Sequence, residues 1–471
     1  MKDSLLDISN SRLFQALLKK AGVNPPPVLS RSKSPWGEQL LRDRNILIGG
    51  EGEHLGPLSK TFVKAGANIF TAPGLNDSTV SAMPHTALSS FENSEKMNTM
   101  KGIFYDASGM DSYAQLKELY GFFHQALLNL KGNARVVILT SIPQDQSHVL
   151  KQTLSQAVIG FAKSMAKELG PKGSTVQIIQ SPEGKEGLDR SSPIAQFFLS
   201  DFSAFITGQV ICTSTLAKAP ENYNFAGSLA GKVVLVTGAI GGIGQGTVMA
   251  MAAEGAHVLC LDHESNKEKL EALAKEVDGT AIPLSLGQDD NPTKLAKIIK
   301  DSVGHVDILV HNAGITRDKT LKRMSEKLWD QVISVNLKSI VEITEHLAET
   351  GLLRDNGRVI CLSSISGLAG NFGQSNYSSA KAGLIAFVNG FSKTVADKGI
   401  TANCVAPGFI ETPMTAKIPF MTRQFGRRLA TLSQGGLPID IANAITFLSS
   451  SAGQGVNGTV LRVCGGHLMG A

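Results

Sequence analysis

Three features that would each place a protein in a particular class are missing from this sequence. No stretch of about 18 apolar residues occurs in the 471-residue chain, so no transmembrane helix is predicted. The net charge of +5 is spread without a block of five or more like charges, which argues against a nucleic-acid-binding tail. The first residues, MKDSLLDISNSRLFQALLKKAG, lack the apolar core of a signal peptide, so we expect a cytoplasmic protein without membrane or nucleic-acid partners.

Cysteines are few, and they are widely spaced. The five are Cys212, Cys260, Cys361, Cys404 and Cys464, and most lie inside apolar runs such as VLCLD and VICLSS. Their spacing matches neither a metal site nor a redox motif. We therefore expect buried thiols in a reducing compartment, and no metal.

The length and the order of the apolar runs indicate several segments. Residues 44–215 and 232–471 each alternate short β-rich apolar runs with helical patterns, which is typical of a parallel α/β sheet. Residues 216–231 are polar, contain Pro and Gly, and are predicted to be a linker. Residues 1–43 join an amphipathic start to Pro-rich NPPPVLSRSKSP. This pattern predicts an extended arm that packs on a dimer partner or on its own domain, or else a flexible tail.

The two large segments also match each other weakly. ILIGGEGEHLG aligns with VLVTGAIGGIG, ARVVILTS with GRVICLSS, and FITGQVICTS with GVNGTVLRVC. We therefore predict an α/β protein with two doubly wound parallel-sheet domains. The C-terminal one has a Rossmann fold, and the N-terminal one is a degenerate Rossmann or flavodoxin-like copy.

The N-terminal copy lacks the residues that would bind a dinucleotide or carry out a reaction. His54 stands where the second copy has Gly242, and a side chain there blocks the approach of a pyrophosphate. Lys151 and Ser155 stand where the second copy has a Tyr–Lys pair, and Ser141 alone is retained. We predict a structural, dimerising or substrate-shaping role for this copy.

The sequence KVVLVTGAIGGIGQGTVMAMAAEGAHVLCLD predicts a strand, a glycine turn, a helix and a second strand. Gly238 allows the tight turn, Gly242 lets the backbone approach phosphate, and Gly244 permits close packing of helix on strand. The helix N-terminus then presents free N–H groups to a pyrophosphate, next to Ile243. Asp262 ends the second strand, where a carboxylate accepts both ribose hydroxyls of NAD and repels the 2′-phosphate of NADP. We predict NADH as the cofactor.

A Ser–Tyr–Lys set lies further along, in RVICLSSISGLAGNFGQSNYSSAKAG. Ser364 ends a predicted strand, and Tyr377 and Lys381 are one helical turn apart on one face. An ammonium beside a phenol lowers the tyrosine pKa, which suits protonation of an alkoxide that forms during carbonyl reduction. The alternative is a surface Tyr and Lys on an ordinary helix.

Residues 232–471 resemble the short-chain dehydrogenases/reductases, and more narrowly the 3-oxoacyl-[acyl-carrier-protein] reductases. Ser364 lies thirteen residues before Tyr377 of YxxxK, as in that family, and the narrower resemblance comes from HNAGITRDKTLKRMSEKLWDQVISVNL, GNFGQSNYSSAKAG and NCVAPGFIETPMT. The whole chain resembles the long form, which carries an extra degenerate N-terminal domain.

The resemblance implies roles for further residues. Asn336 is the fourth catalytic position, holding a water that links Lys381 to solvent, or else it only bonds within a helix. Tyr377 and Lys381 also contact the cofactor, and Lys381 holds the nicotinamide ribose. The remaining implied cofactor-binding residues are Asn312, Ala313, Gly314, Pro407, Gly408, Ile410 and Thr412.

The sequence departs from the family at several positions. His311 replaces the first Asn of NNAG, and we consider strand-end packing and a functional role equally. Gly241 replaces a basic residue common in NADP-preferring relatives, which again favours NADH over the NADPH that carrier-protein reductases usually use. For docking of an acidic carrier, Lys398 matches one basic position of the family, but the other is occupied by Asp355, with Arg354 adjacent. AKIPFMTRQFG is either a lid or an ordinary amphipathic helix.

Together these features predict an NADH-dependent reductase of 3-oxoacyl thioesters, carried on acyl carrier protein or coenzyme A, in fatty acid metabolism. The alternatives are a short-chain dehydrogenase acting on another ketone or alcohol, and a cofactor-binding scaffold without turnover. The resemblance also implies a homo-oligomer, and we favour a dimer.

Overall fold

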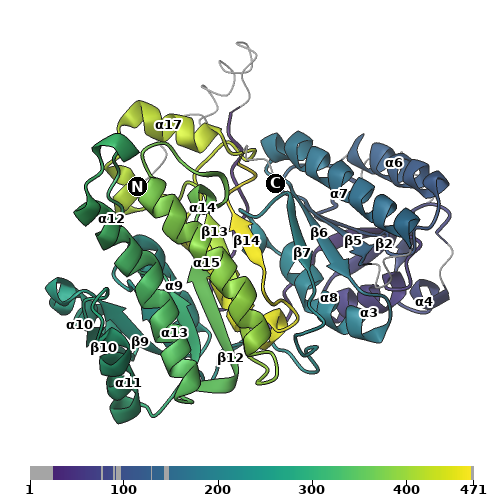
Figure 1. Ribbon diagram of the computed structural model, residues 1–471. Helices are drawn as coiled ribbons and strands as arrows, with labels where there is room; N and C mark the ends of the chain where they lie inside the picture. The colour runs from purple at the N-terminus through teal and green to yellow at the C-terminus, as the bar shows by residue number, and fades with distance from the viewer. Residues whose placement is uncertain are drawn as a thin grey trace.

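The computed structural model describes residues 25–75, 78–88, 91, 97–128, 130–142 and 148–467. The amphipathic start expected within residues 1–24 lies outside these ranges. Two lobes lie side by side, each built around a parallel sheet covered by helices (Figure 1).

The N-terminal sheet has the strand order of a Rossmann fold. In spatial order its strands are β3 (Thr86–Ala87), β2 (Asn68–Thr71), β1 (Asn45–Gly50), β4 (Gly102–Asp106), β5 (Arg135–Ser141), β6 (Thr175–Ser181) and β7 (Gln209–Cys212). All pair in parallel. This 3-2-1-4-5-6-7 order differs from the 2-1-3-4-5 order of flavodoxin, so the degenerate copy is a Rossmann copy.

The C-terminal sheet repeats that order. Its strands are β10 (Thr280–Pro283), β9 (His257–Asp262), β8 (Val233–Thr237), β11 (Val306–His311), β12 (Leu353–Leu362), β13 (Thr401–Pro407) and β14 (Val460–Val463). The prediction of two doubly wound parallel sheets is confirmed.

Helices cover both faces of each sheet, which explains why central strands such as RVVILTS are apolar and wholly buried. The N-terminal lobe packs α3 (Leu55–Lys64) and α8 (Lys185–Leu199) on one face, with α6 (Tyr113–Leu128) and α7 (Val149–Leu169) on the other. The C-terminal lobe packs α9 (Gly242–Ala253), α10 (Lys267–Glu276) and α18 (Pro438–Ser449) on one face. Its other face carries α11 (Asn291–Ser302), α13 (Ser339–Glu349) and α15 (Ser375–Thr394).

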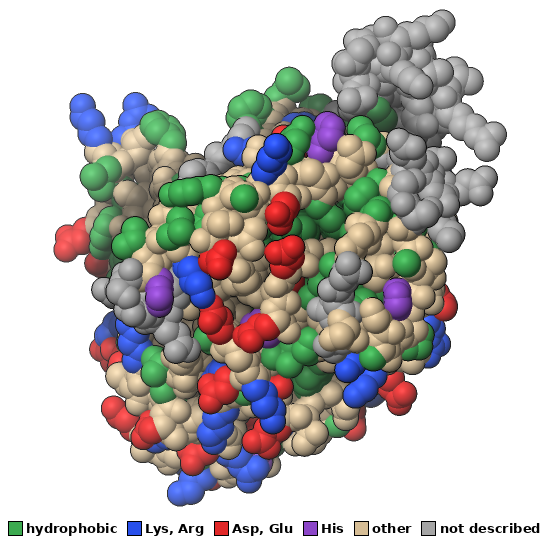
Figure 2. Space-filling model, turned by 90° about the vertical axis from the view of Figure 1, so that its right-hand side faces the viewer, with side chains coloured by type: hydrophobic (Ala, Val, Ile, Leu, Met, Phe, Trp, Pro, Cys, Tyr) green, Lys and Arg blue, Asp and Glu red, His purple; other side chains and the backbone are tan. Residues whose placement is uncertain are grey.

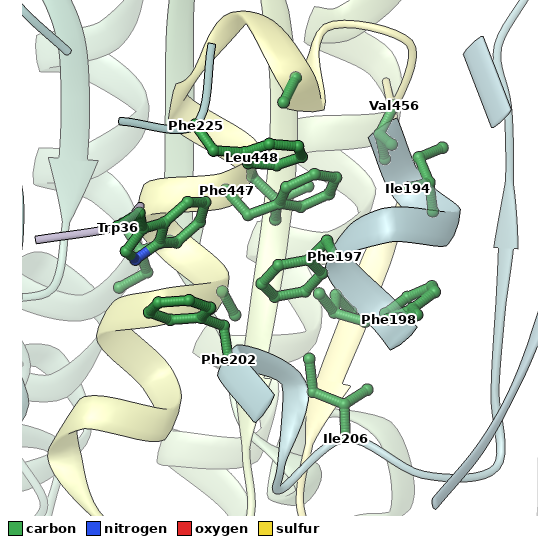
Figure 3. Close-up of a cluster of buried hydrophobic side chains, with 14 of the residues drawn as sticks. Trp36, Ile194, Phe197, Phe198, Phe202, Ile206, Phe225, Phe447, Leu448 and Val456 are labelled. Carbon is green, nitrogen blue, oxygen red and sulfur yellow. The ribbon is translucent and has the colours of Figure 1, made fainter. Parts of the chain in front are cut away.

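The inner layers of the two lobes merge in one apolar cluster, centred on α8 and α18 (Figure 3). The rings of Phe197 and Phe447 stack with centroids 4.3 Å apart and an angle of 8° between their planes. Each ring lies two residues before the last residue of its helix. The two lobes therefore meet through equivalent positions, like the halves of a two-fold dimer.

Backbone hydrogen bonds repeat this symmetry at the edges of the sheets. Gly465 N–H donates to the carbonyl of Phe205 at 2.9 Å, and Ser214 N–H donates to the carbonyl of Gly455 at 3.0 Å. These bonds link the segments that flank β7 and β14, the adjoining edge strands in Figure 1.

The described part of the arm runs across both lobes. Arg31 pairs with Asp440 of α18 at 2.9 Å, and Ser30 bonds to Asp201 beyond α8 at 2.8 Å. Trp36, 2% exposed, packs within 6.0 Å of Phe197 and takes part in the shared cluster (Figure 3). Residues 25–43 therefore pack on both lobes of the chain.

Residues 216–231, the predicted linker, contain neither helix nor strand, but they are packed. Phe225 is buried in the shared cluster, and the Tyr223 hydroxyl bonds to Gln196 at 2.7 Å. The linker therefore adds to the contact between the lobes.

Charged side chains of both signs are mixed on the surface (Figure 2), and the cysteines are unpaired. Acidic and basic side chains are interspersed on the face in Figure 2. None of the helices in the described part of the chain has the length and apolar character needed to cross a lipid bilayer. All five cysteines are free thiols, and Cys212 alone is exposed.

The stacked rings generate a stability prediction. Phe447→Ala opens a cavity between the lobes, and we expect it to lower the free energy of unfolding by about 3–5 kcal/mol. Chemical denaturation followed by fluorescence measures this change. Phe372→Ala, at a position 89% exposed, is the control and should change stability by less than about 0.5 kcal/mol. An effect of Phe447→Ala as small as that of the control would show that the stack does not hold the lobes together.

Candidate active site

The candidate site lies where the parallel strands of the C-terminal sheet end. Successive strands are added to one side of β8 up to β10 and then to its other side from β11 onward, and a crevice opens at such a switch point in doubly wound sheets. The glycine turn follows β8, Asn312 follows β11, and Ser364 follows β12. The carboxyl ends of these strands therefore bring together residues that are far apart in sequence.

The glycine turn leaves no room for side chains. Gly238 has φ +68°, and a Cβ there would lie 2.8 Å from the Cα of Ala313. Asn312 Nδ2 donates to the carbonyls of Thr237 and Gly238, at 3.1 and 2.9 Å. A Cβ at Gly244 would collide with the carbonyl oxygen of Gly238. The turn therefore brings bare backbone to the N-terminus of α9, as a pyrophosphate site requires.

Asp262 lies at the end of β9, with its carboxylate held beside this turn. Its oxygens accept from the N–H groups of Ile240 and His263, at 3.0 and 2.8 Å, and from Asn266 Nδ2 at 2.8 Å. No Lys or Arg is among its partners in the described residues. The carboxylate thus lies next to the glycine turn, held by neutral donors.

The loop after β13 covers the turn. Gly408 N–H donates to the carbonyl of Val463 at 3.0 Å, Ile410 is 3% exposed, and Thr412 caps the short helix α16 (Pro413–Ala416). A Cβ added at Gly242 would lie 3.1 Å from the Cβ of Thr412. Thr412 thus lies against the glycine turn. Pro407 ends β13, and Ile243 lies partly buried in the first turn of α9.

The catalytic candidates converge beside this loop. Ser364 caps α14 (Ile365–Ala369), where its hydroxyl accepts from the N–H of Ser366 at 3.1 Å. Lys381 Nζ lies 5.7 Å from the ring centroid of Tyr377 and donates to the carbonyl of Leu362 at 2.6 Å. The structure thus places the predicted Tyr–Lys pair one turn apart on α15, with Lys381 buried rather than at the surface.

The pKa values of the pair differ from the sequence prediction. Burial raises the pKa of Tyr377, while its hydrogen bond with the Ser364 hydroxyl opposes the rise and the charge of Asp318 adds to it. Lys381 is not among the groups that shift the pKa of Tyr377, so the lowering expected from the Tyr–Lys spacing is not found. Burial lowers the pKa of Lys381 to about 8.

Asn336 lies in a single π-helical turn, residues Ser334–Lys338, between α12 (Glu326–Ile333) and α13. Its Oδ1 accepts from the N–H of Ile315 at 2.8 Å, and its Nδ2 donates to the carbonyl of Ile315 at 2.9 Å. A Cβ added at Gly314 would lie 3.4 Å from Asn336 Oδ1 and 3.5 Å from Lys381 Nζ. The side chain fixes the loop next to Lys381, and π turns of this kind occur frequently at functional sites.

The structure also places His311 and the two positions considered for carrier docking, Asp355 and Lys398. His311 is 1% exposed, and its Nε2 lies 2.9 Å from Thr344 Oγ1, so it packs inside the lobe. Lys398 lies beside Asn356, whose N–H donates to its carbonyl at 2.8 Å. Asp355 and Lys398 are therefore near the amino end of β12, opposite the end that leads to Ser364.

In the N-terminal lobe, side chains fill the region at the carboxyl ends of the strands, which is equivalent to the candidate site. His54 precedes α3 as Gly241 precedes α9, so the helix boundaries place it one position before Gly242, its predicted equivalent. Its Nε2 lies 3.2 Å from the carbonyl of Gly184. The carboxylate of Asp106 packs against Gly52, where a Cβ would collide with it, and burial raises the Asp106 pKa. Ser155 is buried and bonds to the Ser141 carbonyl at 3.0 Å. Among the described residues, this end of the N-terminal sheet has no Tyr–Lys pair, and His54 and Asp106 occupy the place of the glycine turn.

Sequence reasoning missed two contacts. The carbonyl of Leu362 fixes Lys381, and Glu411 forms a buried ion pair with Arg427 of α17 (Phe420–Arg428). A backbone carbonyl leaves no signal in a sequence. Glu411 and Arg427 lie close in sequence, but nothing in their spacing indicates a pairing.

His311 generates a prediction about pH. Burial lowers its pKa from 6.5 to about 4, so the folded state keeps it neutral where the unfolded state binds a proton. Burial of His311 therefore costs no stability above pH 6.5. As the pH falls from 6.5 towards 4, the free energy of unfolding decreases by about 3 kcal/mol, because the unfolded state binds a proton that the folded state does not. We expect His311→Asn to lose correspondingly less stability between pH 6.5 and 4, in denaturant titrations at each pH. His124→Asn, at an exposed position, is the control; equal pH slopes for the two variants would refute the prediction.

Comparison with known proteins agrees with this geometry. The enoyl-(acyl carrier protein) reductase family matches residues 238–467. The 3-oxoacyl-[acyl-carrier-protein] reductase FabG of Thermotoga maritima is 40% identical over 243 residues, which are 50% of this chain and 98% of that protein. The Vibrio cholerae protein of the same name is 39% identical (51% of this chain, 99% of that protein), and nodulation protein G of Rhizobium sp. is 38% identical (51% and 98%). The chain therefore belongs to the short-chain dehydrogenase/reductase family, and its C-terminal lobe is similar to the 3-oxoacyl-[acyl-carrier-protein] reductases.

Proposed function

We propose that this protein uses NADH to reduce 3-oxoacyl thioesters of acyl carrier protein or coenzyme A to 3-hydroxyacyl thioesters, in fatty acid metabolism. The single observation that supports this most strongly is the convergence of Ser364, Tyr377 and Lys381 beside the glycine turn. The names of the similar proteins supply the substrate class.

The residues of the chain fit a nicotinamide dinucleotide. Gly238, Gly242 and Gly244 leave bare backbone for the pyrophosphate, and Asp262 is placed to accept ribose hydroxyls. Thr412 covers the turn, where it would meet the nicotinamide carboxamide. The carboxylate of Asp262, with no cationic partner in the described residues, is what favours NADH over NADPH.

The proton comes from the protein. A bound reduced nicotinamide supplies a hydride to the carbonyl carbon. Tyr377, whose raised pKa keeps it protonated at neutral pH, donates its proton to the developing alkoxide. Ser364 orients the carbonyl through its hydroxyl. Lys381, with a pKa of about 8, is mostly charged at pH 7; it stabilises the tyrosinate that forms and then returns a proton to it. Asn336 holds the adjoining loop, where a water would reprotonate the neutral Lys381 from solvent.

Apolar groups around the site suit an acyl chain. A hollow of about 270 Å³ beside the start of α15 has the apolar side chains of Leu321 and Phe372 in its lining. The rest of the lining is polar or glycine and includes Ser375 and Ser378, which lie on either side of Tyr377 in the sequence. Phe420 and Met421 of α17 expose further apolar surface. Another ketone or alcohol remains the alternative substrate. The convergent catalytic set argues against a scaffold without turnover.

Replacing the proton donor tests the proposal. Tyr377→Phe keeps the ring but removes the acid, so NADH oxidation with acetoacetyl-CoA should fall by about 100-fold or more. NADH binding, measured by calorimetry, should stay within about threefold of the unaltered protein. The exposed Tyr113→Phe is the control.

Equal turnover of Tyr377→Phe and the unaltered protein would contradict the proposed role of Tyr377. An unaltered protein that consumes NADH with cyclic ketones or quinones but with no 3-oxoacyl thioester would favour the alternative substrates. Binding without any turnover would favour the scaffold.

A further inference from the structure

The arm, residues 25–43, reaches the C-terminal lobe at the start of α18. Arg31 Nε donates to both carboxylate oxygens of Asp440, to Oδ1 at 2.9 Å and to Oδ2 at 3.2 Å. The next residue of the arm, Ser32, accepts through its carbonyl from Asn443 Nδ2 at 3.2 Å. Asp440 and Asn443 are three positions apart, so they lie on the same side of α18. The arm is therefore bonded to one side of this helix, within its first two turns.

The arm also bonds to α9, the helix that begins at the glycine turn. Trp36 N–H donates to Glu254 Oε1 at 2.7 Å, and Glu254 directly follows the last residue of α9. The Trp36 ring lies among aromatic residues that include Phe202 and Phe225, with ring centroids 4.8 and 5.9 Å away (Figure 3). These contacts fix the arm at the C-terminal end of α9 as well.

The start of α18 in turn packs on the beginning of α9. Asp440 Oδ2 accepts from the N–H of Leu437 at 2.7 Å, which caps the first turn of α18. Pro438 lies in that turn, and a Cβ added at Gly246 of α9 would lie 3.1 Å from the Pro438 Cβ. Gly246 is about one helical turn after Gly242, so a shift of Asp440 is passed to the end of α9 that would bind the pyrophosphate.

On its other side the arm is fixed to the N-terminal lobe. Ser30 N–H donates to Asn133 Oδ1 at 2.9 Å, and its carbonyl accepts from Arg135 Nη2 at 2.9 Å. The Ser30 hydroxyl donates to Asp201 at 2.8 Å, and Arg135 is fully buried. Because Ser30 directly precedes Arg31, these bonds fix the residue that pairs with α18.

The linker, residues 216–231, makes the reverse crossing. The Tyr223 hydroxyl accepts from Gln196 Nε2 at 2.7 Å and lies 3.0 Å from Ser192 Oγ, both on α8 of the N-terminal lobe. The segment before each sheet therefore bonds to the inner helix of the opposite lobe. The crossing made by the arm ends on the lobe that contains the candidate site, so the arm connects the N-terminal lobe to that site through α18.

We propose that Arg31 is a positioning residue for the dinucleotide site. It holds the first turn of α18 against α9 and so keeps the N-terminus of α9 in the orientation that binds the pyrophosphate. The arm thereby gives the N-terminal lobe a part in the affinity for the cofactor. The inference rests on the proposed dinucleotide site, but it does not depend on which carbonyl compound is reduced.

Calorimetry of NADH binding to the full chain tests this role. Arg31→Gln removes the ion pair, so the Kd for NADH should rise about tenfold, and the KM for NADH should rise with it. The kcat at saturating NADH should stay within about twofold, because the substitution leaves the proton-donating residues of α15 in place. Arg31→Lys keeps the charge but loses the planar guanidinium, so its Kd should rise by about threefold or less.

Asn443→Ala is a second variant, which decides the test if Arg31→Gln does not fold. It removes the bond between α18 and the Ser32 carbonyl but keeps the ion pair. The Kd for NADH should therefore rise by about threefold.

Arg190→Gln is the matched control, because it makes the same chemical change on α8. Arg190 is buried, pairs with Glu186 at 2.9 Å and donates to the carbonyl of Ala217 in the linker. The substitution should lower the free energy of unfolding but leave the Kd for NADH within about twofold of the unaltered protein.

A Kd within about twofold of the unaltered protein in both Arg31→Gln and Asn443→Ala would overturn the inference. An equal rise of the Kd in Arg190→Gln would also overturn it, since any loosening of the chain would then weaken binding. If the unaltered protein binds neither NADH nor NADPH, the proposed function itself fails, and that result is distinct from a loss of affinity seen in the variants alone.

Discussion

The structure depends on the apolar layer in which α8 meets α18. A doubly wound sheet needs helices on both faces, and the inner helices of each lobe are covered by those of the other. The Phe197–Phe447 stack lies at equivalent positions of two equivalent helices, so one chain reproduces the contact of a two-fold dimer. The N-terminal lobe needs no chemistry for this role, since it contributes an apolar surface. Its filled crevice, occupied by the Asp106 carboxylate, is consistent with such a role.

The repeated fold was predictable because its determinants are local. Alternating apolar runs and helical patterns predicted two parallel sheets, and the spacing of Gly238, Gly242 and Gly244 predicted the turn at the N-terminus of α9. The spacing of Tyr377 and Lys381 placed both on one helical face. These features depend on residues a few positions apart, and the structure reproduces their arrangement.

What could not be predicted depends on tertiary surroundings. The pKa of Tyr377 is raised because the folded lobe buries it, which the Tyr–Lys spacing does not reveal. The helix in AKIPFMTRQFG has an apolar side in sequence, but only the fold shows that this side faces outward. The path of the arm depends on Trp36 entering a cluster formed by residues some hundreds of positions away. The ion pair of Glu411 and Arg427 was likewise visible only in three dimensions.

In the proposed reduction, Asp262 would select the dinucleotide, while Tyr377 and Lys381 would serve the proton transfer. Burial keeps Tyr377 protonated and brings Lys381 to a pKa of about 8, so the donor and its charged neighbour are both in the required state at neutral pH. The π turn at Asn336 holds the adjoining loop in place.

The most direct test of an NADH-dependent thioester reductase compares kcat/KM for NADH and NADPH with acetoacetyl-CoA and a longer 3-oxoacyl-CoA. We expect turnover with both thioesters and a clear preference for NADH, because the Asp262 carboxylate repels the 2′-phosphate. A preference for NADPH of about tenfold or more would contradict the role of Asp262. Absence of turnover with either dinucleotide, although NADH binds, would contradict the proposal that coenzyme A thioesters are substrates.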